Sequence, residues 1–348
     1  MSATQSVALQ VDAVLHDVIA QHRREWIAVD PELGFIFDEI ESLARGGGKL
    51  LRPQFCYWGW VSAGGDPNSV MPIEIGAAIE LLHASALFHD DVIDAATTRR
   101  GKTTTHVRHV DLHEAQNFAG EARRFGEGVA ILLGDITYVL SDSLTDNLNA
   151  GSRRLWHNLR MEMNVGQLLD TLGSARRERS LDKTELVSRL KTAKYTIERP
   201  LHIGAVSADE IRGQELLPML SAYGLPLGNA FQMRDDILGA FGDAELTGKP
   251  VGDDFREGKP TSLLARAYRK ATSDQRKILD GVGDPAISEE SIAKIQHIVR
   301  ETGALTEMEA HIVELHDVAV AALDRKKLAG DAYEELVRLA HVVTQRSL

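Results

Sequence analysis

Apolar residues recur at steps of three and four along most of the chain, which places them on one face of a helix. Near the N-terminus Val7, Val11, Leu15 and Ile19 follow this spacing, and the C-terminal third repeats it. No segment alternates convincingly between apolar and polar residues, as a half-buried strand would. The sequence therefore predicts an all-α fold.

Glycine and proline clusters predict where these helices end. They lie at residues 46–48, 64–67, 101–120, 150–151, 174–183, 242–260 and 281–287. Pro200 stands inside an apolar stretch, where proline interrupts the hydrogen bonds of a helix. No break is long enough to read as a linker, so residues 1–348 are predicted to form a single domain, one large helical bundle around a central cavity.

The charge balance excludes some classes of partner. The formal net charge is -12, so nucleic acid and anionic membrane surfaces would repel the chain. The single cysteine, Cys56, cannot form an internal disulfide, which indicates a reducing compartment. We find no signal segment at the N-terminus, and the longest apolar run, residues 129–140, is broken by Gly134 and Asp135. A cytoplasmic protein without stable membrane insertion is expected.

Two acidic clusters each follow an apolar stretch that predicts a buried helix. Asp90, Asp91 and Asp94 form the first cluster, in which Asp90 and Asp94 share one helix face; Asp235 and Asp236 form the second. Carboxylates at the end of a buried helix need a counter-charge, and Mg²⁺ supplies one by binding carboxylates together with substrate phosphates. A solvated acidic surface explains either cluster alone. The pair favours a site for metal ions around a diphosphate, provided that the two helices face each other.

Basic residues accompany these clusters. A surface lysine is usually only solvated, and a lone histidine is more often a core residue, so each is weak evidence by itself. Together with metal ions, however, fixed cations stabilise the charge that develops on a departing diphosphate. Basic residues without paired carboxylates would hold a second diphosphate intact. The basic set comprises Lys49, Arg52, His83, Arg99, Arg100, Lys191, Lys249 and Lys259.

In these residues the chain resembles the trans-isoprenyl diphosphate synthases, from residue 40 to residue 265. The matching segments are 46–53 (GGGKLLRP), 80–83 (ELLH), 89–94 (HDDVID), 99–102 (RRGK), 134–135 (GD), 166–170 (GQLLD), 191–193 (KTA), 231–236 (FQMRDD) and 248–259. The sequence of residues 235–254 is similar to the corresponding segment of actinobacterial geranylgeranyl diphosphate synthases. One departure is Gly239, where the family's second motif often has a third aspartate.

The resemblance implies an isoprenoid synthase fold, a homodimer and a Mg²⁺-dependent prenyltransferase. In the family reaction an allylic diphosphate (C5, C10 or C15) ionises, the double bond of isopentenyl diphosphate attacks the cation, and a proton is lost. The implied ligands of three Mg²⁺ ions per active site are Asp90, Asp94 and Asp235, with Asp91 and Asp236 in support. The implied residues for the allylic diphosphate are Arg99, Lys191, Gln232 and Lys249, with Lys259 nearby and Thr192 stabilising the cation. Those for isopentenyl diphosphate are Lys49, Arg52, His83 and Arg100.

The product length is predicted from Ser85 and Ala86, which lie about one turn before Asp90. Aromatic residues at these positions shorten the product in the family, so two small residues predict a C20 product, geranylgeranyl diphosphate. Ile79 and Tyr138 are candidates for a deeper floor. Alternatively, the small residues serve only close helix packing, and the product is farnesyl diphosphate (C15) or a chain of C25 and above.

Two rival functions share some of these features. A class I terpene cyclase also uses an aspartate-rich motif and Mg²⁺, but it does not need the second diphosphate site formed by Lys49, Arg52 and His83. A non-catalytic subunit of a heteromeric synthase tends to lose acidic ligands, whereas both clusters are present here. Consumption of isopentenyl diphosphate by the protein alone separates the three alternatives.

Overall fold

A computed structural model describes residues 3–242, 252–284 and 286–345 of the chain. In these ranges almost all regular structure is helical, which confirms the all-α prediction. The chain divides into two compact units, and we describe each by itself. Unit 1 is Met1–Arg153 with Pro200–Gln214, and unit 2 is Arg154–Arg199 with Glu215–Leu348. The single domain over residues 1–348 stays a prediction.

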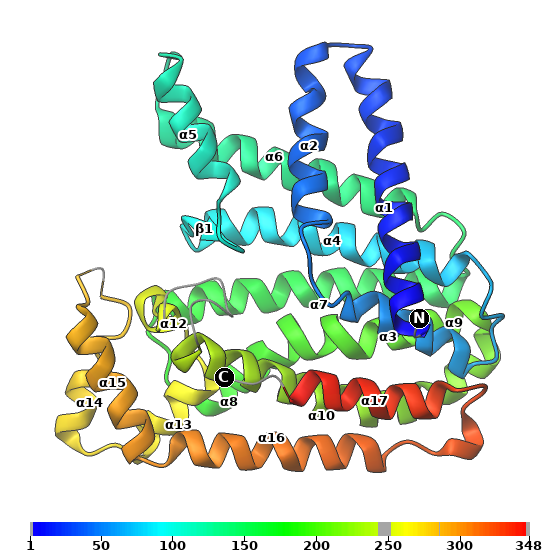
Figure 1. Ribbon diagram of the computed structural model, residues 1–348. Helices are drawn as coiled ribbons and strands as arrows, with labels where there is room; N and C mark the ends of the chain where they lie inside the picture. The colour runs from blue at the N-terminus through cyan, green and yellow to red at the C-terminus, as the bar shows by residue number, and fades with distance from the viewer. Residues whose placement is uncertain (1–2, 243–251, 285, 346–348) are drawn as a thin grey trace. The chain divides into compact units, whose positions relative to one another are not determined.

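Unit 1 consists of helices and one short hairpin (Figure 1). Its elements are α1 (Ala3–Ile27), η1 (Pro31–Leu33), α2 (Gly34–Ala44), α3 (Leu51–Ser62), α4 (Met71–Ile93), β1 (Thr98–Arg99), β2 (Lys102–Thr103), α5 (Thr105–Ala115) and α6 (Ala122–Ser143). Helix α7 (Ala150–Ala175) begins in this unit, and α9 (Arg199–Ala208) lies in it from Pro200 onward. Helices α4 and α6 run side by side in opposite directions.

Helix α4 lies in the core of unit 1 because apolar residues surround it on most sides. Ile79, Leu81 and Leu82 are 0% exposed. By length and composition α4 would also suffice to cross a membrane, which the sequence analysis overlooked. However, 72% of its most apolar window is buried inside the protein. This burial is what the core helix of a globular protein requires.

The predicted break at residues 46–48 is confirmed between α2 and α3. Gly47 and Gly48 have φ angles of +95° and +148°, a region that favours glycine. Close packing then brings α3 onto α4, since a Cβ atom at Gly76 would lie 3.0 Å from Cβ of Pro53. The turn therefore places the residues after it, including Arg52, beside α4.

The predicted break at residues 101–120 is only partly right, because α5 lies within it. The helix buries His106, His109 and His113, and histidines carry too little apolar signal to reveal its buried face. One short hairpin also interrupts the helices, although no segment of the sequence alternates as a strand would. β1 and β2 pair antiparallel, with Thr98 opposite Thr103, but strands this short are below the length at which alternation can be recognised.

In the described residues of unit 2 all regular structure is helical (Figure 1). It contains most of α7, then α8 (Leu181–Ser188), the π-helical segment η2 (Arg189–Glu198), most of α10 (Glu210–Phe241), α12 (Asp253–Glu257), α13 (Ser262–Lys270), α14 (Ser273–Leu279), α15 (Glu289–Glu301), α16 (Ala304–Ala321), η3 (Arg325–Lys327) and α17 (Ala332–Thr344). Apolar residues of α10, α13, α15 and α16 form one buried core cluster. The interruption predicted at Pro200 is not seen, because the chain stays helical through it; the segment changes from the π-helical η2, which ends at Glu198, to α9, in whose first turn Pro200 lies.

Candidate active site

The first acidic cluster lies at the C-terminal end of α4, in unit 1. Asp91 is 5% exposed, and its Oδ1 atom accepts a hydrogen bond of 2.6 Å from Nε of Arg99. Nη2 of Arg99 also lies 3.4 Å from Oδ2 of Asp90. Asp94 caps the helix, and its backbone N–H donates to the carbonyl oxygen of Asp90 at 2.8 Å. The acidic motif and the first arginine of the basic pair therefore meet within one unit.

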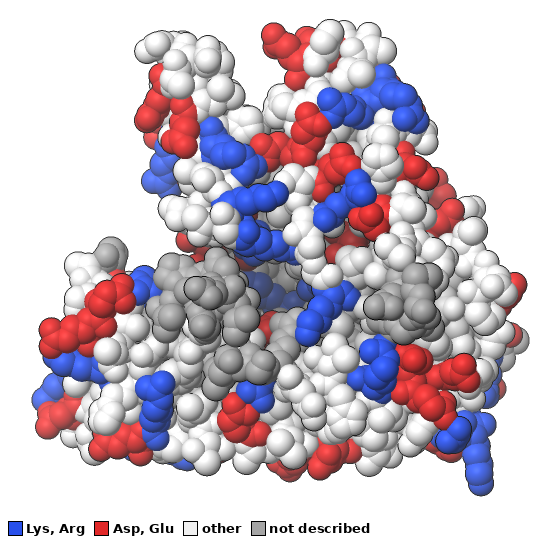
Figure 2. Space-filling model, in the orientation of Figure 1, with Lys and Arg blue, Asp and Glu red and all other residues white. Residues whose placement is uncertain are grey.

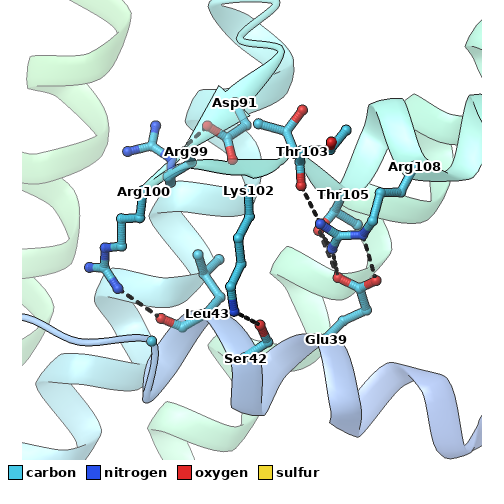
Figure 3. A pocket seen from close by; sticks show the side chains of 12 residues that line it. Glu39, Ser42, Leu43, Asp91, Arg99, Arg100, Lys102, Thr103, Thr105 and Arg108 are labelled. Atoms are coloured by element: carbon cyan, nitrogen blue, oxygen red, sulfur yellow. Dashed lines mark hydrogen bonds and ion pairs between the residues drawn. The ribbon is translucent and has the colours of Figure 1, made fainter. Parts of the chain in front are cut away.

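A basic pocket lies between the hairpin, the end of α2 and the start of α5 (Figure 3). Its charged lining consists of Arg99, Arg100, Lys102 and Arg108 against Glu39 and Asp91. Figure 2 shows Lys and Arg side chains gathered on the surface over the hairpin and the adjoining ends of α2 and α5. Local charge is thus positive in a chain whose net charge is negative, which favours anions at this place.

One ion pair attaches the hairpin and α5 to α2, and the sequence analysis missed it. Nε of Arg108 donates to Oε1 of Glu39 at 3.2 Å, and its Nη1 donates to the carbonyl oxygen of Thr103. Thr105 Oγ1 adds a hydrogen bond of 3.0 Å to Oε2 of Glu39. These contacts hold the segment that carries Arg99 and Arg100 (Figure 3).

Arg52, His83 and Arg100 influence one another electrostatically in unit 1. Burial lowers the pKa of His83 well below its usual value, and the charges of Arg52, Arg100 and Arg99 lower it further. The imidazole is therefore neutral at pH 7 and has one N–H to donate. Nη1 of Arg100 donates to the carbonyl oxygen of Leu43 at 3.4 Å. Lys49 lies in the exposed segment that precedes α3.

In unit 2 a chain of hydrogen bonds joins the second acidic cluster to η2. Thr192 Oγ1 donates to Oε1 of Gln232, whose Nε2 atom donates to Oδ1 of Asp236 at 2.7 Å. The backbone N–H of Ser262 donates to Oδ2 of Asp236 at 3.2 Å. Lys191 donates from Nζ to Oδ2 of Asp170 at 2.7 Å, and Asp170 ends the GQLLD segment.

Lys191 and Thr192 lie in the π-helical segment η2. Such wide turns interrupt α-helices frequently at functional sites. Gly228 of α10 allows the close approach, since a Cβ atom there would lie 2.4 Å from Cα of Ala193. The KTA segment and the FQMRDD segment are therefore neighbours in unit 2, as the resemblance leads one to expect.

Asp254 explains the departure at Gly239. A Cβ atom at Gly239 would lie 2.0 Å from Oδ2 of Asp254, so the carboxyl group of Asp254 occupies the space of a side chain at that position. The pKa of Asp236 is raised to about 8, mainly by burial. The hydrogen bond from Gln232 lowers this pKa, and the charges of Asp254 and Asp235 raise it. The second acidic cluster thus has a third carboxylate nearby, from α12 instead of α10.

Two predicted lysines follow this cluster. Nζ of Lys259 lies 2.5 Å from Oε2 of Glu257, so this lysine is held in an ion pair beside α12. Its backbone N–H donates to the carbonyl oxygen of Asp254 at 3.0 Å. Lys249 lies outside the described residues.

The described residues contain no group of three or more His, Cys, Asp or Glu side chains arranged to hold a metal ion. The predicted ligands divide between the units, with Asp90 and Asp94 in unit 1 and Asp235 in unit 2. This division agrees with Mg²⁺ chemistry, because Mg²⁺ binds one or two carboxylates and takes its other ligands from water and phosphate. Each unit supplies carboxylates of the kind that such an ion requires.

An all-α fold with carboxylates at the end of α4 and inside α10, which continues to Phe241, and with lysines and arginines beside them, defines a class: enzymes that act on diphosphates with a divalent metal. The family model described as Polyprenyl synthetase matches residues 35–301. The chain belongs to this family, and it is a trans-prenyltransferase of the isoprenyl diphosphate synthase type. The family resemblance stated from the sequence is confirmed.

Individual relatives differ in product. The chain is 33% identical over 306 residues to a geranylfarnesyl diphosphate synthase of Aeropyrum pernix, covering 85% of this chain and 89% of the relative. It is 28% identical over 312 residues to an octaprenyl diphosphate synthase of Escherichia coli, covering 87% of this chain and 88% of the relative. Among solved structures, a geranylgeranyl pyrophosphate synthase from Corynebacterium glutamicum, complexed with isoprenyl diphosphate and magnesium, has a TM-score of 0.87. It is 35% identical, and the match covers 97% of this chain and 99% of that one.

Proposed function

We propose that this protein is a geranylgeranyl diphosphate synthase, which adds isopentenyl diphosphate to allylic diphosphates until the chain reaches C20. The observation that carries the product length is the pair Ser85 and Ala86, about one turn before Asp90 on α4. Small side chains at these positions would leave more room for a growing hydrocarbon than aromatic ones, and Ser85 is buried at 1% exposed. The similar structure from Corynebacterium glutamicum, named as a geranylgeranyl pyrophosphate synthase, supports the same length.

Tyr138 is the stronger of the two candidates for the floor of the hydrocarbon pocket. Nε2 of His89 lies 3.1 Å from the carbonyl oxygen of Ile131, and a Cβ atom at Gly134 would meet the His89 ring. Helices α4 and α6 run in opposite directions (Figure 1). One turn after Gly134 on α6 and one turn before His89 on α4 therefore lie at about the same level, and these are positions 138 and 85. Ile79, in contrast, is 0% exposed within the core packing of α4.

The acidic clusters would bind three Mg²⁺ ions per active site through Asp90, Asp94 and Asp235, with Asp91 and Asp236 in support. The ions would neutralise charge on the departing diphosphate. The chain's own contribution is to hold these carboxylates at the end of α4 and within α10. Gln232 donates a hydrogen bond to Asp236, and Arg99 donates to Asp90 and Asp91.

The two substrates would use different basic residues. The set for isopentenyl diphosphate is Lys49, Arg52, His83 and Arg100, all of them in unit 1. The set for the allylic diphosphate is Arg99, Lys191, Gln232 and Lys249, with Lys259 nearby. The hydroxyl of Thr192 donates to Gln232, which leaves its oxygen lone pairs able to stabilise the allylic cation.

We further propose a cytoplasmic homodimer in which residues 1–348 act as one domain. A stripe on α6 supports self-association, since Phe125, Leu132 and Val139 are spaced by seven residues and are 37%, 62% and 68% exposed. Apolar side chains that line up on a helix surface in this way are typical of interaction surfaces.

The decisive experiment incubates pure protein with Mg²⁺, labelled isopentenyl diphosphate and each allylic primer, and sizes the dephosphorylated products. A C20 alcohol is the expected result. The variants Asp90→Ala and Asp235→Ala should lose activity by about a hundredfold or more, because each removes stabilisation of charge at the leaving group. A C15 alcohol or a longer ladder would keep the reaction class and reject the product length. Absence of isopentenyl incorporation would indicate the cyclase or the partner-dependent subunit instead.

A further inference from the structure

Three charged side chains of unit 2 form an ion cluster to which the proposed reaction assigns no part. Oε1 of Glu162 on α7 accepts a hydrogen bond of 2.8 Å from Nζ of Lys194 in η2. Arg199, which directly follows η2, donates from Nε to Oε2 and from Nη2 to Oε1 of the same carboxylate, both at 2.7 Å. The side chains of Lys194, Glu162 and Arg199 are only 15%, 21% and 13% exposed. Charge-assisted hydrogen bonds in such surroundings are strong, so they restrain the segment that carries them.

The face of α7 that carries Glu162 is the face that packs against η2. Glu162, Gly166 and Asp170 follow one another at steps of four, which places them on one side of the helix. A Cβ atom at Gly166 would lie 2.7 Å from the backbone nitrogen of Lys191, so the two backbones approach closely there. Asp170 accepts from Nζ of Lys191 at 2.7 Å. Helix α7 therefore holds η2 through two carboxylates, one on each side of the glycine.

Helix α10 also contacts η2 closely. A Cβ atom at Gly228 would lie 2.4 Å from Cα of Ala193, and one at Gly224 would lie 3.1 Å from Cα of Glu198. Oγ of Ser221 donates to Oε1 of Glu198 at 2.7 Å. Because these backbones nearly touch, a change in the winding of η2 would move its side chains relative to α10.

The winding of η2 needs contacts from outside the segment. A π-helix is rare, and this one continues for ten residues, with Lys191 and Thr192 near its start. Burial raises the pKa of Glu162, but the hydrogen bonds from Arg199 and Lys194 and the charges of both residues bring it below its usual value. The carboxylate is therefore ionised at pH 7 and attracts both cations.

We propose that Glu162 is a positioning residue that holds η2 in its π-helical form and thereby sets Lys191 and Thr192 in place for the departing diphosphate and the allylic cation. The inference rests on the proposed roles of Lys191 and Thr192. Without the carboxylate, the wide turns of η2 would relax towards an α-helix, and both side chains would rotate about the helix axis. A small displacement of groups that stabilise a transition state slows the reaction strongly.

The test compares Glu162→Gln with the wild type in steady-state kinetics. Glutamine keeps the shape and removes the charge, so kcat should fall about tenfold or more. The KM for isopentenyl diphosphate should stay within about twofold of wild type, because the residues proposed to bind it lie in unit 1. The matched control is Asp12→Asn in unit 1, which also removes a carboxylate that accepts two hydrogen bonds from one arginine, at 2.8 and 2.9 Å from Arg45. Both variants should lower the Tm, and only Glu162→Gln should lower kcat.

A second background separates positioning from a general weakening of the fold. In a chain that already carries Lys191→Ala and Thr192→Ala, the groups that Glu162 positions are gone. Adding Glu162→Gln should then lower kcat by less than about twofold, since the effects of residues that act together are not additive. The full loss in that background would overturn the proposal, because Glu162 would then act through other groups or through the fold.

The variant Lys194→Met keeps the proposal testable even if Glu162→Gln does not fold. It removes one cation of the cluster and leaves Glu162 with both hydrogen bonds from Arg199. The Tm should stay close to that of wild type, and kcat should fall about threefold, because one of the charge-assisted contacts that restrain η2 is lost. An unchanged kcat in a folded Lys194→Met variant would overturn the proposal.

The single variants Lys191→Ala and Thr192→Ala distinguish the two levels of the argument. If both leave kcat unchanged, the proposed roles of these residues are wrong, and the role of Glu162 is rejected with them. If both lower kcat while a folded Glu162→Gln variant does not, the roles of Lys191 and Thr192 stand and only that of Glu162 is wrong.

Discussion

At the scale of single residues, the position of the Asp254 carboxyl group on α12 depends on a glycine at position 239 on α10. The carboxyl group of Asp254 lies where a side chain at position 239 would start, at 2.0 Å from the ideal Cβ. A third aspartate on α10 and the observed place of Asp254 therefore exclude each other. Because residue 239 is a glycine, the carboxylate of Asp254 on α12 can lie beside the acidic cluster.

Gly239→Asp should destabilise the protein by about 1–3 kcal/mol, because the new side chain displaces Asp254 and adds a like charge beside it. Thermal unfolding should show a lower Tm, and adding Asp254→Ala to the same chain should restore it. As a control, Gly34→Ala at the start of α2 meets only ordinary contacts, at 3.4 Å and beyond, and should leave the Tm about unchanged. A single Gly239→Asp variant as stable as wild type would show that Asp254 has room to move away.

Ser85 governs the proposed product length. Ser85→Phe should shorten the main product from C20 to C15, because an aromatic ring one turn before Asp90 closes the space that the last isoprene unit requires. Sizing the dephosphorylated products measures this, and Ala86→Ser, which replaces one small residue with another, should leave the product at C20. An unchanged product in a folded Ser85→Phe variant would place the floor elsewhere.

At the scale of elements, α5 depends on a cluster of histidines and aromatic rings. The His109 ring lies 5.4 Å from that of Phe35 and 6.2 Å from that of Phe125, and Nδ1 of His109 has no hydrogen-bond partner among the described residues. Burial lowers the pKa of His109; the charge of Glu39 opposes this, and that of Arg108 adds to it. The folded form thus takes up a proton less readily than the unfolded chain.

Stability should therefore be complete above the unfolded pKa of about 6.5 and should fall as the pH drops below it, since the unfolded chain binds the proton first. His109→Phe keeps an aromatic ring in the cluster and should reduce the loss of Tm between pH 7.5 and pH 5.5. His297 is exposed, and His297→Gln should leave the loss unchanged. Identical pH dependence in His109→Phe and wild type would assign the effect to other groups.

At the scale of the whole molecule, the apolar stripe of α6 is the feature that bears on assembly. Leu132→Glu places a charge in the middle of the stripe and should convert a dimer into a monomer of 38.2 kDa, measured by light scattering during size-exclusion chromatography. Val313→Glu changes a residue of similar exposure on α16 and should stay dimeric. A monomeric wild type would reject the dimer itself.

The sequence by itself determined the class of fold and the kind of chemistry. Helical periodicity depends on residues three and four apart, so the helices could be predicted without knowledge of their partners. Glycine clusters predicted the turns, because their effect on the backbone is local. The acidic motifs are local patterns too, and they predicted the C-terminal end of α4 and the region of Asp235. Helix α5, the five-residue helix α12 and the hairpin escaped, because histidines and very short elements leave no clear periodic signal.

The tertiary structure alone decided which side chains meet. Glu39 and Arg108 are 69 residues apart, and Lys191 reaches Asp170 across 21 residues. Such contacts depend on how helices cross and on where glycines let their backbones approach, which no local pattern encodes.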